Sequence, residues 1–402
     1  MKKFLMLATV TLVAAAMGSA RGTAQSTGPY KVLKAERVGG EGGWDYIFAD
    51  PTGRKLYIPR GAVRGAPPAD AAPVAPGERP PQGPIVTPDR IVVYNLDTLE
   101  KVTEIPDTGG NGVAVCPKTG HGFSSSHPPG GLSMFDTKNL TLIKKIEVPQ
   151  GFGPDGIYCD TFNDHVYIGS HPTKSLLVVD AKDGSVVGSV DLGGTPEQTI
   201  ADGKGTVYQV LQDRPGGVAV IDAKTLKVTA KYMFGDETTG NGSCNGLALD
   251  VKNSILFAAC AGVGPAPARG SAPPPPPPAG TPGPQAFVIM SAKDGKILAK
   301  LPLAGGSDGA AFNPDTMEAF STQGNGTMTI VKEMSPTSFE VEQNLDTKNG
   351  ARTITLDSKT GHLFTMAQEF GPAPPPQPGA TPGRGGRGPA VPGSFTILMI
   401  GK

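Results

Sequence analysis

The sequence has no net charge, few aromatic side chains, and none of three motifs that mark common enzyme classes. Basic and acidic residues both number 36 in 402 residues, and aromatic residues make up 6%. A chain without a basic excess or regular aromatic platforms is a poor candidate for nucleic-acid binding. The motifs CxxCH, HExxH and GxxxxGK[ST] are absent, which excludes covalently attached haem and argues against zinc-protease and P-loop chemistry.

The sequence has only one long apolar run, and it lies at the N-terminus. Lys2 and Lys3 precede an apolar segment that ends at Met17, and small residues follow as far as Ala24. This pattern is typical of a secretory signal peptide. We therefore expect residues 1–24 to be removed and the mature protein to be periplasmic or secreted. The run is short for a membrane span, so we expect no span after its removal, and removal of three basic residues lowers the net charge to −3.

Glycine and proline are abundant, with 56 and 41 residues, and much of the proline lies in three stretches. The stretches are 62–88, 261–284 and 371–393. Such sequence buries too little apolar surface to fold, so we expect three disordered inserts. They are either loops that tolerate neutral expansion or arms that surround a ligand or dock a partner.

The rest of the chain repeats one unit seven times. Each unit has a short apolar strand, a turn, a second strand with an aromatic residue, a third strand of the V-x-V-D type and a fourth of the K-V-x-x-I type. The turn residue and the aromatic residue are Asp50 and Tyr57, Cys116 and Phe123, Asp160 and Tyr167, Asp202 and Tyr208, Asp250 and Phe257, Asn313 and Phe320, and Asp357 and Phe364.

Alternating β-branched residues between Gly, Asn and Asp predict antiparallel strands. Four strands in a repeat of about 43 residues are typical of a β-propeller blade. The sequence thus predicts an all-β, seven-bladed propeller over residues 30–402. The last unit lacks a fourth strand, whereas the segment that starts at Tyr30 is a strand without a blade. We expect this N-terminal strand to complete the last blade and close the ring.

Two long segments carry a resemblance to a known family. The segments VVDAKDGSVVGSVDLGGTPEQ and GVAVIDAKTLKV, with LYIPRG and VYIGSH at the second strands, are similar to the YVTN-repeat, YncE-like β-propellers. The resemblance covers residues 30–402 apart from the inserts. It implies an exported seven-bladed propeller and says little about chemistry, because propellers support many functions.

The register of the repeat predicts a polar ring at one mouth of the central channel. The residue five positions before the turn residue is polar in every blade. These residues are Asp45, Asn111, Asp155, Glu197, Asn245, Asp308 and Arg352. The alternative is a turn position in which Asp and Asn bond the local backbone, and the Gly that follows in four blades favours that interpretation.

The second strands end on the same face, where they predict further polar residues. These are Arg60, His127, His171, Gln212, Gln323 and Gln368. His127 and His171 occupy the same place in neighbouring blades. They are either solvated loop residues or general bases and metal ligands near the carboxylates. The other three histidines lie near the opposite face and receive no function.

The four cysteines indicate disulfides in an exported protein. Cys244 and Cys260 lie almost opposite each other when the strands of the fifth blade are counted outward from their turn, so we predict a bond between them. Cys116 and Cys159 lie on inner strands of neighbouring blades. They either pair or remain two buried thiols.

We therefore expect a monomeric exported propeller that binds a small molecule or an exported protein through its polar face, with Asp45, Arg60, Gln212, Gln323, Arg352 and Gln368 as ligand-binding residues. The alternative is a metal-assisted hydrolase of the lactonase type. Clustered carboxylates recruit a cation, and oxygen ligands favour Ca²⁺. Its ligands would be Asn111, Asp155, Glu197, Asn245 and Asp308, with His127 or His171 activating water. Arg352 weighs against this site because its guanidinium can neutralise the acids instead. A redox-cofactor protein is a third class and ranks last, because the sequence has no haem-attachment motif.

Overall fold

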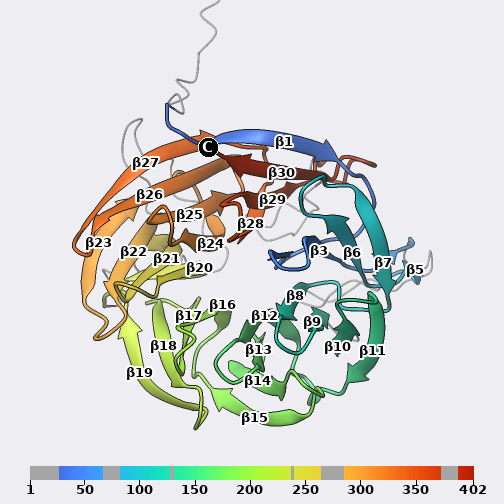
Figure 1. Cartoon of the computed structure of the whole chain (residues 1–402), viewed down its shortest axis with the longest axis horizontal. Coiled ribbons are helices and arrows are strands. Elements are labelled where there is room, and N and C mark those ends of the chain that lie inside the picture. Colours follow the sequence, from blue (N-terminus) through green and yellow to red (C-terminus); the bar gives the residue numbers. More distant parts are fainter. Residues whose placement is uncertain (1–26, 67–81, 127–130, 237–239, 264–284, 373–387) are drawn as a thin grey trace, which may run out of the picture.

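The seven sequence repeats become seven sheets around one axis. The protein was analysed as a computed structural model that describes residues 27–66, 82–126, 131–236, 240–263, 285–372 and 388–402. These residues form seven four-stranded antiparallel sheets arranged in a ring (Figure 1). The predicted seven-bladed β-propeller is therefore confirmed. Within the described ranges, no helix is long and apolar enough to cross a membrane.

Each blade runs from an inner strand at the axis to an outer strand at the rim. Blades 1 to 3 consist of β2 (Phe48–Asp50), β3 (Lys55–Arg60), β6 (Arg90–Asn95) and β7 (Lys101–Pro106); β8 (Gly112–Cys116), β9 (His121–Ser126), β10 (Gly131–Asp136) and β11 (Thr141–Ile146); and β12 (Pro154–Asp160), β13 (His165–Ser170), β14 (Ser175–Asp180) and β15 (Val186–Asp191).

The remaining blades follow the same plan. Blades 4 to 7 consist of β16 (Pro196–Ala201), β17 (Thr206–Leu211), β18 (Gly217–Asp222) and β19 (Lys227–Met233); β20 (Asn241–Asp250), β21 (Ile255–Val263), β22 (Ala286–Ser291) and β23 (Ile297–Pro302); β24 (Ser307–Asn313), β25 (Glu318–Gln323), β26 (Thr327–Ser335) and β27 (Ser338–Asp346); and β28 (Arg352–Leu356), β29 (Leu363–Ala367), β30 (Thr396–Gly401) and β1 (Lys31–Arg37).

The turn between the first two strands of a blade explains the recurring Asp. In blade 1, Oδ1 of Asp50 accepts hydrogen bonds from the backbone N–H groups of Thr52 and Gly53. The next residue, Arg54, has φ of 51°, the left-handed conformation that ends the turn. Asp160 caps its own turn in the same way through the N–H of Phe162.

The hydrophobic core is divided among the contacts between neighbouring blades. Seven clusters of buried side chains each join two adjacent blades. In β3, Leu56 and Ile58 pack toward blade 7, whereas Tyr57 packs toward blade 2. Because strand side chains alternate between faces, each middle strand contributes to two clusters. The ring therefore holds a long chain without a single large core.

Blade 7 closes the ring with both ends of the described chain. Strand β1 pairs antiparallel with β30 and forms the outer edge of the blade (Figure 1). Tyr30, just before β1, packs its ring at 5.3 Å from that of Phe320 and donates its hydroxyl hydrogen bond to the buried Glu318 of blade 6. The predicted closure by the N-terminal strand is confirmed.

The prediction of disorder is wrong at the edges of the inserts. Within 62–88, β4 (Val63–Arg64) pairs with β5 (Ile85–Thr87), and β21 extends as far as Val263, into 261–284. Within 371–393, Ala390 forms a bridge with Phe370. Backbone pairing between the two ends of a loop satisfies their polar groups, so these edges continue the blades. Most of each insert lies outside the described residues.

Candidate functional site

Backbone bulges aim the predicted ring residues at the axis. The pairing of the first two strands shifts register at or directly beside ring residues in five blades. These residues are Asp155 in β12, Glu197 in β16, Asn245 in β20, Asp308 in β24 and Arg352 in β28. A bulge bends its strand and redirects a side chain. Asn111 directly precedes β8, and Asp45 lies three residues before β2.

One half of the ring forms a chain of polar contacts across blades 2 to 4. Nδ2 of Asn111 donates to Oδ1 of Asp155 at 2.5 Å. Nε2 of His171 lies 2.7 Å from Oδ2 of Asp155 and 3.4 Å from Oε1 of Glu197. The same Oε1 accepts a hydrogen bond of 2.7 Å from Gln212. Asp155 and Glu197 therefore share one imidazole, and polar contacts link three neighbouring blades.

The chain continues across blades 5 to 7. Gln212 also donates to Oδ1 of Asn245 at 3.3 Å, and Asn245 donates in turn to Oδ1 of Asp308 at 3.1 Å. The guanidinium of Arg352 donates to Oδ2 of Asp308 and to the backbone oxygen of Trp44, both at 2.9 Å. Polar contacts thus run from blade 2 around to the start of blade 1. The amide nitrogens of Asn111 and Asn245 are both used on acids.

The glycines after four ring residues have a different cause from the turn chemistry that the sequence suggested. Gly112, Gly156, Gly246 and Gly309 do not have positive φ. A Cβ on Gly246 would instead lie 2.7 Å from the backbone carbon of Gly309 in the next inner strand. Real Cβ atoms do not approach backbone this closely. The glycines therefore allow the inner strands to converge near the axis.

The ring concentrates charge in a buried setting. Within the described part of the chain, its four carboxyl groups face the guanidinium of Arg352 and the imidazole of His171. Burial and the nearby Asp155 raise the pKa of Glu197 to about 7, and burial with the charge of Asp308 raises the pKa of Asp45 well above its ordinary value. Contact with Asp155 raises the pKa of His171 to about 9, against the opposing effect of burial. Several perturbed pKa values in one buried cluster are typical of functional sites.

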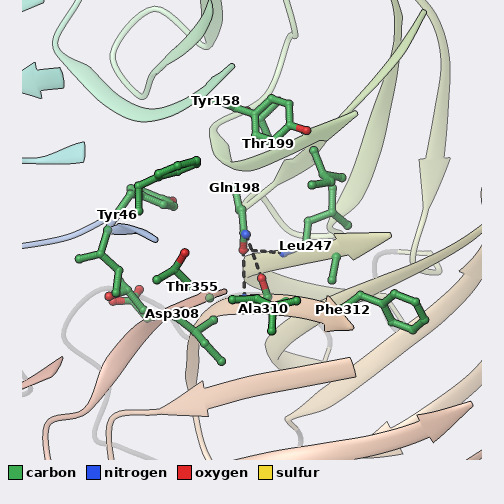
Figure 2. A pocket seen from close by; sticks show the side chains of 18 of the residues that line it. Tyr46, Tyr158, Gln198, Thr199, Leu247, Asp308, Ala310, Phe312 and Thr355 are labelled. Carbon is green, nitrogen blue, oxygen red and sulfur yellow. Dashed lines mark hydrogen bonds between the residues drawn. The ribbon is translucent and has the colours of Figure 1, made fainter. Parts of the chain in front are cut away.

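Two residues that the sequence analysis did not single out bridge blades across the channel beside the ring. The hydroxyl of Tyr46 reaches across from blade 1 and donates to Oε2 of Glu197 at 2.7 Å. Gln198 accepts hydrogen bonds from the N–H groups of Leu247 and Ala310 and donates to the oxygen of Ala310, which ties blades 4, 5 and 6 together (Figure 2). A cavity of about 240 Å³ remains around these groups.

A groove on the same face leads to Asp155 and His171. It has a volume of about 1140 Å³, and its described lining comes from blades 1 to 3. Ile85 of β5 lies along it, Lys145 and Glu147 add charge, and Asp155 and His171 form its inner end. The His171 cluster is therefore the part of the ring that a ligand in this groove would meet.

The other predicted ligand-binding residues are less available. Arg60 is 2% exposed; it donates to the oxygen of Glu41 and its guanidinium lies 3.7 Å from the centre of the Phe395 ring. Gln323 is fully buried and bonds within blade 6, to the oxygen of Ser321. Gln368 is 6% exposed. His127 lies outside the described residues.

One enzyme-like string occurs in the ring without the surroundings that its chemistry requires. Residues 305–309 read GGSDG and match the nucleophile motif GxSxG. That motif works where a strand turns sharply into a helix and exposes the serine. Ser307 instead begins the antiparallel strand β24, is buried, and accepts a hydrogen bond from Ser321. The match does not form a nucleophile elbow.

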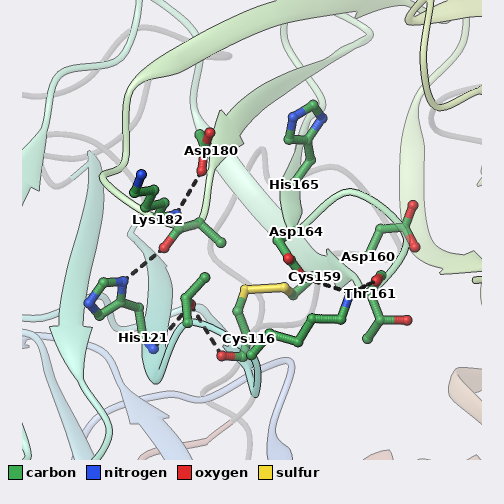
Figure 3. Close-up of a disulfide and its surroundings, with 12 residues drawn as sticks. Cys116, His121, Cys159, Asp160, Thr161, Asp164, His165, Asp180 and Lys182 are labelled. Atoms are coloured by element: carbon green, nitrogen blue, oxygen red, sulfur yellow. Dashed lines mark hydrogen bonds and ion pairs between the residues drawn. A yellow bond between two sulfur atoms is a disulfide. The ribbon is translucent and has the colours of Figure 1, made fainter.

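Two disulfides lie on the inner part of the propeller. Cys244 of β20 and Cys260 of β21 are bonded within blade 5. Cys116 of β8 is bonded to Cys159 of β12, between blades 2 and 3 (Figure 3). This second bond lies at the end of the inner strands opposite the ring. The alternative of two free thiols does not hold for the pair, since the described residues include no free cysteine.

Comparisons with known proteins agree with the propeller fold. The chain resembles the structure of U3-55K with a TM-score of 0.59 and 10% identity, over 92% of this chain and 98% of that one. It resembles the WD40 repeats of RRP9 with a TM-score of 0.61 and 10% identity, over 94% and 100% of the two chains. The sequence matches no protein-family model and no curated protein. At this identity the likeness shows the fold alone, a seven-bladed propeller with WD40-repeat neighbours.

Proposed function

We propose that this protein is an exported β-propeller of the YVTN-repeat type that binds a ligand or partner protein through the polar face around its channel. The observation that carries the proposal is the cluster of His171, Asp155 and Glu197, of which His171 and Asp155 line the inner end of a large groove. Three mutually interacting, partly buried ionisable groups that face a concavity are a default binding-site hypothesis.

Two further observations support this proposal. Tyr46 and Gln198 bridge blades across the channel beside the ring, so the polar groups of the face are held in position by contacts between blades. Propellers with WD40 repeats serve widely as interaction scaffolds, and this chain shares their fold. Export rests on the pattern of residues 1–24, which is typical of a cleaved signal peptide.

The experiment is fractionation followed by native mass spectrometry of the exported protein. We expect an N-terminus after Ala24 and a bound species that wild type retains and an Asp155→Asn, Glu197→Gln double variant loses. Asp160→Asn, at the other end of β12, is the matched control and should retain the species. Retention by the double variant would place binding elsewhere, and a cytoplasmic, uncleaved protein would contradict export.

A second candidate is the Ca²⁺-dependent lactonase. The excess of ring carboxylates over cationic groups favours it, whereas the use of Asp308 by Arg352 removes one of its five ligands. A Ca²⁺ held by the remaining oxygen ligands would polarise a lactone carbonyl, and His171 in its neutral form would accept a proton from the attacking water. The C–O bond of the lactone ester would then break, giving a hydroxy acid. Hydrolysis of dihydrocoumarin that requires Ca²⁺ and stops with EDTA would support this candidate, and its absence would remove it.

A further inference from the structure

We propose that Asp155, His171 and Glu197 form a binding site for a divalent transition metal of the Zn²⁺ type. This inference builds on the proposed function, because it names a ligand for the same face. The three residues each present one donor atom, and these atoms all lie within 4.8 Å of one another. They come from the inner strands of blades 3 and 4 and from the loop directly after β13. The set differs from the oxygen-only Ca²⁺ ring because it contains an imidazole.

The distances suit a small tetrahedral ion. Ligand bonds of about 2.0–2.1 Å in tetrahedral geometry place neighbouring ligand atoms about 3.3 Å apart. Nε2 of His171 and Oε1 of Glu197 are 3.4 Å apart, which matches this value. Nε2 and Oδ2 of Asp155 are 2.7 Å apart, so Asp155 needs to move by roughly half an ångström. Three protein ligands leave a fourth position toward the groove.

The contact between His171 and Asp155 is close without being a well-aligned hydrogen bond. Nε2 is buried and has no hydrogen-bond partner of acceptable geometry, although Oδ2 is 2.7 Å away. A buried ring nitrogen of this kind, directed at two carboxylates, is a typical metal donor.

Neighbouring side chains hold the two carboxylates in position. Asn111 donates to Oδ1 of Asp155 and leaves Oδ2 toward His171. Tyr46 donates to Oε2 of Glu197 and leaves Oε1 toward the imidazole. Asp155 and Glu197 are 6% and 7% exposed, so these orientations are maintained by the protein. Such outer partners orient ligands in metal sites.

The chemistry of the donors selects the class of metal. Ca²⁺ takes six to eight oxygen ligands, whereas mixed imidazole and carboxylate sites suit Zn²⁺ and its first-row neighbours. Asp308, which an all-oxygen site would use, is paired with Arg352 at 2.9 Å. The geometry therefore favours a Zn²⁺-type site at blades 3 and 4 over a Ca²⁺ site across the whole ring.

The test is metal titration of the full mature protein after EDTA treatment and dialysis. We expect calorimetry with ZnCl₂ to give one site per chain, and Co²⁺ to produce visible absorption bands of a nitrogen- and oxygen-bound ion. His171→Asn and Glu197→Gln should each weaken Zn²⁺ binding by about 100-fold or more, and Asn111→Ala by about 10-fold, because it orients a ligand. His165→Asn, on the opposite side of blade 3, is the matched control and should bind as wild type does.

Several outcomes would overturn the site. They are the absence of a Zn²⁺ isotherm and Co²⁺ bands in wild type, unchanged binding in His171→Asn, and a melting temperature raised by Ca²⁺ but not by Zn²⁺. The Co²⁺ spectrum needs no variant, so misfolding of a mutant does not obscure the result. Failure of the metal site would leave Asp155 and His171 as an ion pair. The native mass spectrometry above would still decide the broader binding proposal.

Discussion

The two ends of the inner strands use the same residue type in different ways. In β12, Asp155 and Asp160 lie five positions apart. Asp160 caps the turn of its own blade through the N–H of Phe162. Asp155 contacts Asn111 of blade 2 and lies beside His171, which also reaches Glu197 of blade 4. One end of the strand satisfies its polar group locally, and the other end shares it among blades.

This difference shows how a repeat acquires a site. The Asp at the turn end of the inner strand recurs because the turn of each blade needs the same cap. A single repeat is therefore enough to explain this residue. The polar residue at the other end of the inner strand, the axis end, recurs because seven inner strands converge there. These residues are explained only by their contacts with neighbouring blades. A polar residue that is repeated in sequence can therefore be structural at one end and part of a shared network at the other.

The largest expected effect comes from removing the disulfide at the turn end of the inner strands. Cys116→Ser with Cys159→Ser should lower the free energy of unfolding by about 4 kcal/mol, because the bond closes a loop of 43 residues. The loop of 16 residues closed by Cys244 and Cys260 predicts about 3 kcal/mol for the corresponding double variant. Urea unfolding under non-reducing conditions measures both. Equal stability of all three proteins would show that neither bond constrains the unfolded chain.

The next largest effect is a pH dependence of stability. It comes from a contact between two blades near the turn end. Glu333 of blade 6 accepts a hydrogen bond from Asn253 of blade 5 at 2.6 Å, and burial raises its pKa to about 7. The folded protein therefore binds this proton more tightly than the unfolded chain. Stability should rise by up to about 3 kcal/mol as the pH falls from above 7 to about 4.5.

Comparison with Glu333→Gln isolates this contribution from other titrating groups. The variant should lose that part of the pH dependence, so the difference in unfolding free energy between the two proteins should change between pH 8 and pH 5. Guanidinium titrations at a series of pH values provide the measurement. A constant difference would mean that Glu333 has an ordinary pKa.

A smaller effect tests how closely neighbouring inner strands approach each other at the axis end. Gly246→Ala should destabilise the protein by about 2 kcal/mol, since the new Cβ would press on the backbone of the neighbouring inner strand. Gly306→Ala is the matched control, because a Cβ there meets nothing within 4 Å, and it should leave the melting temperature nearly unchanged. Similar melting temperatures for the two variants would show that the inner strands have room to separate.

The smallest effect concerns a single turn cap. Asp160→Ala should cost about 1 kcal/mol, as the loss of other side-chain caps of backbone N–H groups does. The effect should stay within blade 3, so hydrogen exchange should quicken near Phe162 and remain unchanged near Asn111. Faster exchange in blade 2 would mean that the turn end is shared among blades after all.

The fold was predictable because the repeat encodes it locally. Turn residues such as Asp50 and aromatic residues such as Tyr57 set the strands of each blade, and the unpaired first strand predicted closure. The register also identified the residues that meet at the axis, including Asp155 and Glu197. Each of these inferences needs only one repeat and its copies.

The contacts across the axis were not predictable from one repeat. Tyr46 and Gln198 bridge blades across the channel, yet each lies beside a ring residue and breaks no pattern. The bulges that aim Asp308 and its counterparts depend on pairing between strands, which the sequence does not show. The glycines were visible, but their cause is the approach of another blade. Contacts between blades arise only after the ring has formed.

The pairing of β1 with β30 sets the order in which the protein is completed. Strand β1 emerges from the ribosome early and finds its partner only after Thr396–Gly401 have been synthesised. Until then the first blade lacks the neighbour against which Leu56 and Ile58 pack. A chain that crosses a membrane as a polypeptide must remain unfolded until it has passed. Late closure suits such a route, because the last step of folding takes place only when the whole chain has arrived.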